Sequence, residues 1–565
     1  MRFQKIRAGL AGLLFVLLLS GATGYFAARA AGEEAAGLPA AAGAAMRGID
    51  AEKIRAHVRF LAHDLLEGRG TGARGGDIAA EYMAAQFALD GLKPAGDNGT
   101  YMQKVPMVGV RTLPETSFTL APAQGEPVRL KLLDDFVTNN ESQTETAEID
   151  APVVFVGFGI QAPEYNWDDF KGVDLRGKVV VMFVAEPASD DPKFFKGKAL
   201  TYYGRWTYKF EEAARQGAVA ALVIHRRDLA SYGWEVVRSS WGGERSYLQR
   251  DATPKLKAAA WIQWDVANRL VGYGGHDLNK LFQAAQSRDF KPIELPVRLK
   301  AHLASQLRPF VSNNVLAMLP GANAQRRGEA VLYTAHYDHL GINPAMAGDN
   351  IYNGALDNAT GCGILLEMAR AYASLKEGPA RSVYFAAVTA EEQGLLGSEY
   401  LGKHPPIAPA KITVDLNYDD LPPLGDPEEV EINGAERTTF YPAVEETARS
   451  FGMAIAPDAQ PEAGHYYRSD HFSLARVGIP SFSINEGVKF AGHSAEWGMA
   501  QHKDYNEHYY HQPTDEYKPE MDFTGDAKMA RFGFALGWKA ATLPGVAGWQ
   551  PGDEFEPARK ASQKP

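Results

Sequence analysis

Apolar and polar positions follow one repeating pattern from about residue 314 onward. Three apolar runs end in polar residues, and a helical stretch separates the first two: VLYTAHYD, ATGCGILLEMARAYASL, SVYFAAVTAEE and ITVDLNYDD. Within the helical stretch, Ile364, Leu365, Met368 and Tyr372 recur at helical spacing. Strands that alternate with helices in this way predict a three-layer α/β fold built on a mixed, largely parallel sheet.

Residues 151–295 have a different pattern. Four short apolar runs are separated by turns rich in Pro, Gly and Asp: PVVFVGFG, GKVVVMFV, AVAALVIH and AAAWIQW. One helical stretch, FEEAARQGA, precedes the third run. Short strands with few helices predict a compact, strand-rich unit. The flanking residues 48–150 and 296–543 are then expected to form the α/β domain.

The N-terminal segment reads as a targeting signal. Arg2, Lys5 and Arg7 precede the apolar run LAGLLFVLLLSGATG, and the small-x-small sequence Ala28-Arg29-Ala30 follows. This pattern predicts a secretory signal peptide over residues 1–30 and a periplasmic or secreted protein. An uncleaved membrane anchor is the alternative, because the apolar stretch is nearly long enough to span a bilayer.

Three further segments are predicted from local composition. Residues 31–47 are rich in Ala and Gly and are expected to form a flexible linker. Asp77 is expected to cap a helix that ends near Gly91. Residues 544–565 are rich in Pro, Lys and Glu and are expected to form a loose tail.

The composition of the 565 residues excludes some classes of protein. A hydrophobic content of 45% and a charged content of 22% are those of an ordinary globular chain. The net charge of -11 argues against a nucleic-acid binder. The single cysteine, Cys362, makes no intramolecular disulfide and so does not identify the redox compartment. The oligomeric state is left open.

Acidic and imidazole side chains follow the predicted strands. His336 and Asp338 end the first, Glu391 and Glu392 the second, and Asp419 the third. Each alone has an ordinary explanation, such as a helix cap or a solvated turn. In a largely parallel sheet, however, ligands gather at the carboxyl ends of the strands, so these side chains can converge in space.

Asp357 and His511 complete a candidate metal site. Asp357 lies just before the predicted helix, where a helix cap is the ordinary reading, and His511 lies in the polar loop YHQPTDEY. Two imidazoles and three carboxylates suit zinc or a similar divalent ion. In a two-metal site one carboxylate bridges both ions, and a further carboxylate that binds neither can act as a base.

The order of these motifs resembles that of the cocatalytic zinc peptidases. The order is His-x-Asp, Gly-Ala-x-Asp-Asn, Glu-Glu, Asn-x-Asp and Tyr-His-x-Pro-x-Asp. That family contains bacterial and fungal aminopeptidases and, more distantly, glutamate carboxypeptidase. LEGRGTGARGGDIAAEYMAAQF and NNVLAMLPG also resemble family segments. Residues 151–295 resemble the protease-associated domain that many members carry as an insertion, with VFVGFGI and FKGVDLRGKVVVM as typical phrases.

The resemblance implies a role for each candidate residue. It implies two zinc ions per chain, bridged by Asp357, with these other ligands: His336, Glu392, Asp419 and His511. It also implies that Asp338 orients His336, that Glu391 is the general base, and that Tyr510 hydrogen-bonds the oxyanion. Asp470 and His471 in YRSDHF match a recurring phrase without an assigned role.

The implied activity is removal of the N-terminal amino acid from peptides or proteins. A carboxypeptidase or another amidohydrolase on the same two metals is the alternative, kept open by Arg468 in a matched loop. A binding protein that had lost catalysis would be expected to lack a ligand, and every ligand position is filled. Two departures from the simplest family members bear on substrate specificity: the longer stretch between His339 and Asp357, and Asp420 beside the predicted ligand Asp419.

Overall fold

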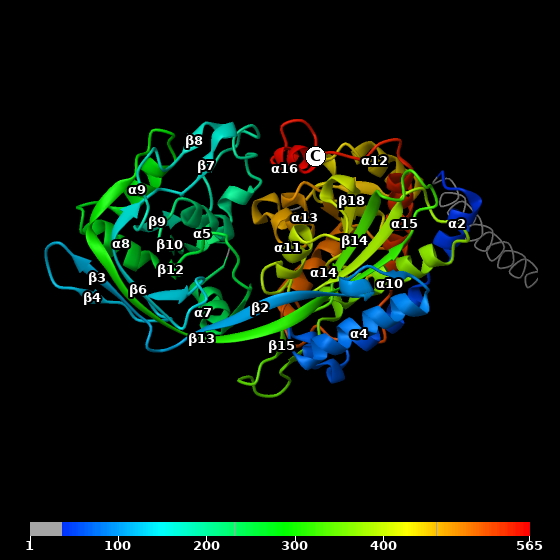
Figure 1. Cartoon of the computed structure of the whole chain (residues 1–565), viewed down its shortest axis with the longest axis horizontal. Helices are drawn as coiled ribbons and strands as arrows, with labels where there is room; N and C mark the ends of the chain where they lie inside the picture. The colour runs from blue at the N-terminus through cyan, green and yellow to red at the C-terminus, as the bar shows by residue number, and fades with distance from the viewer. Residues whose placement is uncertain (1–36, 231, 459, 565) are drawn as a thin grey trace, which may run out of the picture. The chain divides into compact units, whose positions relative to one another are not determined.

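The computed structural model describes residues 37–230, 232–458 and 460–564 (Figure 1). Within these ranges the chain forms two compact units. The first comprises the residues up to Lys104, Asn313–Pro457 and the residues from Ser469 onward; the second comprises Val105–Ser312 and Asp458–Arg468. The predicted signal peptide over residues 1–30 lies outside the described residues.

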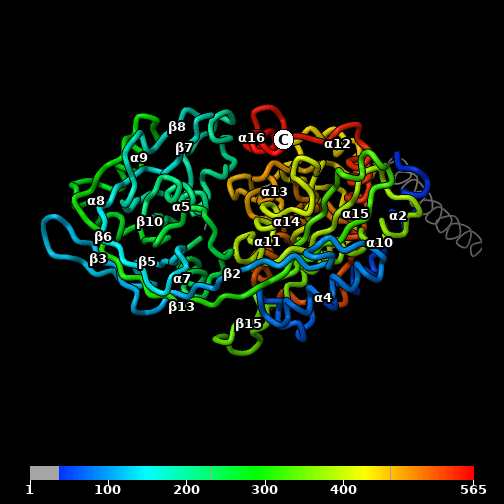
Figure 2. Tube along the Cα trace, in the orientation of Figure 1, coloured from blue at the N-terminus to red at the C-terminus, as the bar shows by residue number. Residues whose placement is uncertain are grey.

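The second unit is longer than the predicted segment 151–295 at both ends. Strand β3 (Ser117–Pro122) pairs antiparallel with the first half of β13 (Ile293–Leu319), and β5 (Phe136–Asn139) pairs antiparallel with β12 (Ala258–Ile262). Residues before 151 therefore supply strands to the sheet of this unit. Strand β13 then carries the chain into the first unit (Figure 2).

The second unit also contains more helix than its sequence pattern predicts. Its central strands run parallel in the order β6–β9–β10–β12: Thr146–Phe155, Val179–Phe183, Ala220–Ile224 and Ala258–Ile262. Both faces of the sheet are buried against helices, which is why β9, β10, β12 and the end of β6 are continuously apolar. Helices α8 and α9 cover one face, and α5 and α7 the other: Trp264–Gly272, Leu278–Ala285, Trp206–Arg215 and Trp234–Gly242.

The first unit contains the predicted mixed, largely parallel sheet. Four strands run parallel in the order β21–β18–β14–β17: Ser481–Ser483, Ile412–Asn417, Ala330–His336 and Ser382–Val388. The end of β13 pairs antiparallel with β17, and β1 (Lys93–Pro94) pairs antiparallel with β13. The strands predicted from the three apolar runs are confirmed.

Helices cover both faces of this sheet and make three layers. Alternate side chains of a strand point to opposite faces, so Val331, Tyr333 and Ala335 of β14 join one apolar core and Leu332 joins another. The first core includes α3, α4, α10 and α15: Ala51–Leu61, Arg74–Leu89, Gly361–Ala373 and Thr524–Thr542. The second includes α11 (Leu396–Lys403) and α13 (His471–Arg476).

Smaller elements complete the first unit. A three-stranded sheet has the order β20–β19–β22, and a hairpin joins β15 to β16. In the sheet, β20 is Ala454–Ala456, β19 is Glu429–Glu431 and β22 is Asn485–Glu486; in the hairpin, β15 is Gly341–Ile342 and β16 is Ile351–Tyr352. Two further helices are α12 (Tyr441–Ser450) and α14 (Ala495–His508).

Both predicted loose ends of the α/β domain are ordered. Part of the predicted linker forms helix α2 (Ala40–Arg47), which buries Met46. The predicted tail forms helix α16 (Glu556–Ser562), and the buried Arg559 donates hydrogen bonds to the carbonyl oxygens of Pro409, Ile412 and Ala547. A long side chain can therefore anchor a segment whose composition is polar.

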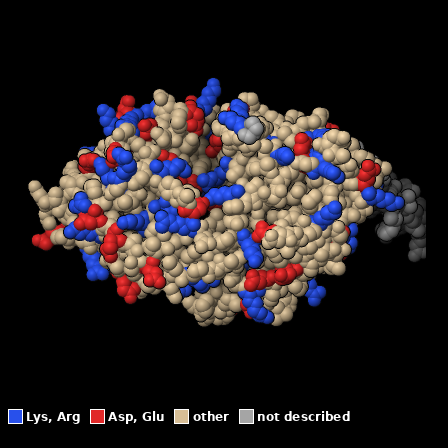
Figure 3. All heavy atoms as spheres, viewed as in Figure 1, with Lys and Arg blue, Asp and Glu red and all other residues tan. Residues whose placement is uncertain are grey.

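Two general surface properties follow from the described residues. No helix in the described ranges has the length and apolar character needed to cross a membrane. On the face shown in Figure 3, Lys and Arg side chains are interspersed with Asp and Glu, and no extended basic area covers that face.

Candidate metal centre

Three neighbouring parallel strands deliver the candidate residues to one edge of the sheet. His336 is the last residue of β14, Glu391 and Glu392 follow β17, and Asp419 follows β18. In the register of the sheet, His336 lies opposite Val388 of β17, so the strand ends are level. The predicted convergence of polar side chains at this edge is present.

Asp357 reaches the same place from the segment before α10. The carboxylate of Asp515 accepts hydrogen bonds from the backbone N–H groups of Leu356 and Asp357, at 3.0 and 3.2 Å. The side-chain amide of Asn358 donates to the carbonyl oxygen of Tyr418 at 2.9 Å. These bonds hold the Asp357 segment between the strand ends and the loop that carries His511.

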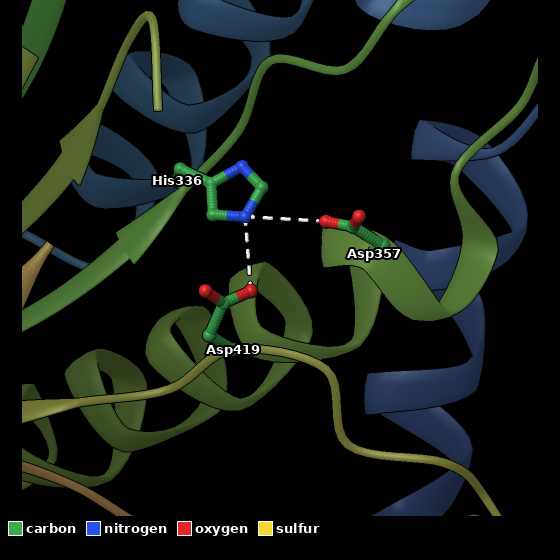
Figure 4. Close-up of side chains that lie close together, drawn as sticks. All are labelled: His336, Asp357 and Asp419. Carbon is green, nitrogen blue, oxygen red and sulfur yellow. Dashed lines mark hydrogen bonds and ion pairs between the residues drawn. The ribbon is translucent and has the colours of Figure 1, made fainter. Parts of the chain in front are cut away.

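The first group of possible ligands is His336, Asp357 and Asp419. Nε2 of His336 lies 2.9 Å from Oδ1 of Asp419 and 3.3 Å from Oδ1 of Asp357 (Figure 4). One ligand atom from each residue lies within 4.8 Å of the other two. An imidazole and two carboxylates at these distances can share one cation.

The second group lies on the other oxygen of Asp357. Oδ2 of Asp357 is 3.2 Å from Nε2 of His511, which is 3.1 Å from Oε2 of Glu392. Nδ1 of His339 is 2.6 Å from Oε1 of Glu392 and 3.8 Å from Oδ2 of Asp357. Asp357 thus offers one oxygen to each group, as a bridging carboxylate would.

Neighbouring charges shift the pKa values of residues in both groups. Burial opposes the charged form of His336, but Asp419 and Glu391 outweigh it and raise the pKa of His336 well above its usual value. Burial likewise opposes the ionised form of Glu392, but His511 and His339 outweigh it and lower the pKa of Glu392 to about 2. The pKa of His336 is therefore shifted toward its charged form and that of Glu392 toward its ionised form, at the place a cation would take.

Asp338 anchors the neighbouring segments rather than contacting the His336 ring directly. Nδ1 of His336 lies 3.1 Å from the backbone carbonyl oxygen of Asp338 and 3.9 Å from its carboxylate. The carboxylate accepts hydrogen bonds from the hydroxyl of Thr71 at 2.7 Å and from the backbone N–H of Glu391 at 3.2 Å. Burial raises the pKa of Asp338 to about 6.

Ser469 and Asn417 hold Asp419 in place. The hydroxyl of Ser469 donates to Oδ2 of Asp419 at 2.5 Å and accepts from the amide of Asn417 at 2.8 Å. Oδ1 of Asp419 is left facing His336. Hydrogen bonds of this kind fix the orientation of metal-ligating carboxylates.

Arg69 stabilises the backbone of the segments that form the site. Its buried guanidinium donates hydrogen bonds to the carbonyl oxygens of Tyr337, Asn353 and Gly354, at 2.8, 2.6 and 2.9 Å. These carbonyls belong to the segments that carry His336 and Asp357. Because one planar group ties two segments together, Arg69 fixes their spacing.

Glu391 and Tyr510 lie beside the two groups without belonging to either. Glu391 follows the strand with Glu392, and burial, together with Asp419 and Glu392, raises its pKa well above the usual value. The ring of Tyr510 stacks on that of His511 with centroids 4.0 Å apart, and 38% of its surface remains exposed.

The donor set fits zinc. Zinc takes imidazole nitrogen and carboxylate oxygen ligands. Within the described ranges, both ring nitrogens of His339 and Oε1 of Glu392 are buried without a hydrogen-bond partner. Buried polar atoms are nearly always satisfied, so orphaned atoms that face one another at this place fit a cation.

Sequence reasoning gave no role to several residues that shape the site. His339 was visible in the HYDH motif but had no assigned function, and Thr71 and Arg69 lie in the segment LEGRGTG, far away in sequence. Ser469 precedes Asp470 in YRSDHF. The only signal was that these residues belong to segments that resemble family motifs.

Comparison with curated proteins finds partial matches. Leupeptin-inactivating enzyme 1 of Streptomyces exfoliatus is 29% identical over 219 residues, which are 37% of this chain and 46% of that protein. A probable zinc metalloprotease of Pyricularia oryzae is 33% identical over 177 residues, 31% of this chain and 32% of that protein. Aminopeptidase NAALADL1 of Mus musculus is 34% identical over 135 residues, 22% and 16% of the two chains. The chain therefore matches less than half the length of each of these relatives.

Solved structures and a family model complete the comparison. The aminopeptidase from Aneurinibacillus sp. strain AM-1 is 18% identical, with 90% of this chain and 98% of that chain covered and a TM-score of 0.49. BSAP, a zinc aminopeptidase from Bacillus subtilis, is 17% identical, with 90% and 97% covered and a TM-score of 0.42. Residues 314–532, which carry all the candidate ligands, match the model of peptidase family M28.

Proposed function

We propose that this chain is a zinc-dependent exopeptidase that hydrolyses the N-terminal amino acid from peptides, with two zinc ions per chain. The observation that carries the proposal is the position of Asp357, whose two oxygens face two different groups of imidazoles and carboxylates. The match of residues 314–532 to a peptidase family model supports peptide hydrolysis, and a relative described as a probable zinc metalloprotease supports the metal.

Each ion would have its own ligands beside the shared one. His336 and Asp419 would hold one ion, Glu392 and His511 would hold the other, and Asp357 would bridge them. Bound zinc supplies Lewis acidity, which polarises a carbonyl and makes a coordinated water more acidic. The network of Asp515, Ser469 and Thr71 would keep these ligands oriented before substrate arrives.

Glu391 would move the proton. It lies next to Glu392 in sequence but outside both ligand groups, and its backbone is fixed by the hydrogen bond to Asp338. A positioned carboxylate that binds no metal can take a proton from water and give it to the leaving amine. Tyr510, beside His511, would donate a hydrogen bond from its hydroxyl to the oxyanion.

Charge near the site supports binding of an ammonium group rather than a free carboxylate. Asp420, adjacent to Asp419, places one more carboxyl group at the site, and its Oδ1 accepts a hydrogen bond from Tyr505 at 2.8 Å. Arg69 has its guanidinium occupied by backbone carbonyls and is not available to a substrate carboxylate. The carboxyl oxygens of Asp420 can accept hydrogen bonds from an α-ammonium.

The test compares two substrates on one preparation. The purified chain is assayed on aminoacyl-arylamides and on peptides with a C-terminal Glu, before and after treatment with a strong chelator, and again after zinc is added. The proposal expects hydrolysis of the arylamides only, loss with chelator and recovery with zinc. Preferential hydrolysis of the C-terminal Glu peptides would establish the carboxypeptidase alternative, and full activity in a preparation shown to be free of metal would refute the mechanism.

A further inference from the structure

We propose that His339 is a ligand of the ion held by Glu392 and His511, so that this metal position has two imidazoles and the other has one. The inference rests on the proposed function, because it presumes that zinc binds at the two groups. It adds a residue that the motif pattern left without a role.

The distances bring His339 to the same place as His511. Nδ1 of His339 and Nε2 of His511 approach different oxygens of Glu392, at 2.6 and 3.1 Å. Both nitrogens also face Oδ2 of Asp357, at 3.8 and 3.2 Å. The two rings are nearly perpendicular, at 73°, with centroids 5.8 Å apart. Two imidazole nitrogens and two carboxylates thus surround one point.

The contact between His339 and Glu392 lacks the geometry of a hydrogen bond. Although the two atoms are close, neither ring nitrogen of His339 nor Oε1 of Glu392 has a hydrogen-bond partner within the described ranges. His339 is 1% exposed, so water does not solvate its ring freely. An unsatisfied buried polar group costs about 1–3 kcal/mol. A cation between the nitrogen and the oxygen would satisfy both atoms.

The fold holds the ring of His339 at this point. Its backbone N–H donates to the carbonyl oxygen of Arg69 at 3.2 Å. Gly354 has a positive φ of 57°, and a Cβ atom there would lie 2.6 Å from Cγ of His339. A side chain at residue 354 would therefore displace the ring. Glycine at residue 354 leaves room for the imidazole beside Asp357 and Glu392.

The experiment compares the wild-type chain with His339→Gln, and uses His404→Gln as the control. His404 is an exposed histidine just after α11, whose ring stacks on Tyr400. The chains are loaded with Co²⁺, and the hyperfine-shifted, exchangeable ring N–H signals of coordinated imidazoles are counted by NMR. The affinity of each chain for each of its two metal ions is measured by competition with a chelator.

The inference expects three imidazole signals in the wild-type chain and in His404→Gln, and two in His339→Gln. It also expects the affinity for one of the two metals to fall in His339→Gln by at least the roughly 10–100-fold that loss of a supporting group causes. The wild-type count does not depend on whether the variant folds, and a thermal melt of the metal-free variant separates misfolding from loss of a ligand.

Two other outcomes are distinguishable. A wild-type chain that binds two metals but gives only two imidazole signals overturns the role of His339 and leaves the proposed function intact. A folded wild-type chain that binds fewer than two metals overturns the proposed function, and the role of His339 with it.

Discussion

Both units contain neighbouring parallel strands followed by polar residues, and the candidate metal centre described above lies at the strand ends of the first unit. In the second unit, Glu186 follows β9, His225 follows β10 and Gln263 follows β12. Each has a partner of its own in the surrounding loops. Glu186 accepts from the backbone N–H of Thr201 at 2.9 Å, His225 lies 3.0 Å from the carbonyl oxygen of Tyr232, and Gln263 donates to a backbone carbonyl at 2.5 Å.

In the first unit, the polar side chains after the strands face one another instead. His336 contacts Asp357 and Asp419, and Glu392 contacts His339 and His511. In the second unit, the polar side chains after the strands are thus satisfied by hydrogen bonds within the loops. In the first unit, imidazoles and carboxylates face one another in an arrangement that suits a bound cation. The type of residue at a strand end is therefore weaker evidence for a site than whether imidazoles and carboxylates converge there.

The largest effect is expected from replacing Glu391 with Gln. This change keeps the size of the side chain and removes its ability to take a proton, so the rate should fall roughly 10²–10⁴-fold while zinc content stays the same. Glu392→Ala should instead lose zinc along with activity, because it removes an atom from the second group. Metal analysis and turnover on both purified variants check the pair.

The assigned roles of the two glutamates would be wrong if Glu391→Gln lost its zinc or Glu392→Ala kept both ions and full activity. If Glu391→Gln were fully active, the proposed proton path would be wrong, although the ligand assignments would stand.

A smaller effect is expected at Asp526, a buried carboxyl at the start of α15 that interacts with Glu486. Burial raises the pKa of Asp526 from 3.8 to about 8. The folded state therefore keeps a proton that the unfolded state releases between these pH values. The stability from this group is fully present below pH 3.8 and is lost as pH rises through about 8.

Asp526→Asn should remove this pH dependence without changing zinc content. The free energy of unfolding of the variant minus that of wild type should increase from pH 5 to pH 8 by on the order of a few kcal/mol, because only wild type loses stability over this range. Urea unfolding at the two pH values measures the change. If the difference in the free energy of unfolding between the two proteins is the same at both pH values, Asp526 does not titrate in this range. If Asp526→Asn loses zinc, Asp526 contributes to the metal site.

The smallest effect is expected in the second unit. Glu186→Gln weakens a charge-assisted hydrogen bond to Thr201 and should cost about 1–3 kcal/mol of stability. Glu186 hydrogen-bonds a loop and does not act on substrate. Turnover and zinc content should therefore stay within about twofold of wild type. A tenfold loss of turnover in a folded, zinc-loaded variant would break the contrast between the two units.

The strands and the convergence of the candidate ligands could be predicted from the sequence, because buried strands leave long apolar runs and the polar residues that end them stand out. Helix α4 was harder to place. It begins at Arg74, before the expected cap Asp77, since Gly75 lets it approach the carbonyl oxygen of Leu66 where a Cβ would lie only 1.6 Å away. Glycine there reflects a close contact that local propensity does not reveal.

Features set by contacts distant in sequence could not be predicted. The tail looked loose because its composition is polar, yet Arg559 anchors it through three backbone carbonyls. The limits of the second unit depend on which strands pair with β13, and the sequence of one strand does not reveal its pairing partner. His339 lay in a visible motif, but its closeness to Glu392 required the fold.

The most direct test of the account is an anomalous-scattering map of crystals of the zinc-loaded chain, measured on both sides of the zinc absorption edge. The account predicts two peaks, one among His336, Asp357 and Asp419, and one among Asp357, Glu392 and His511. A single peak, or peaks away from Asp357, would contradict the claim that this carboxylate bridges two ions.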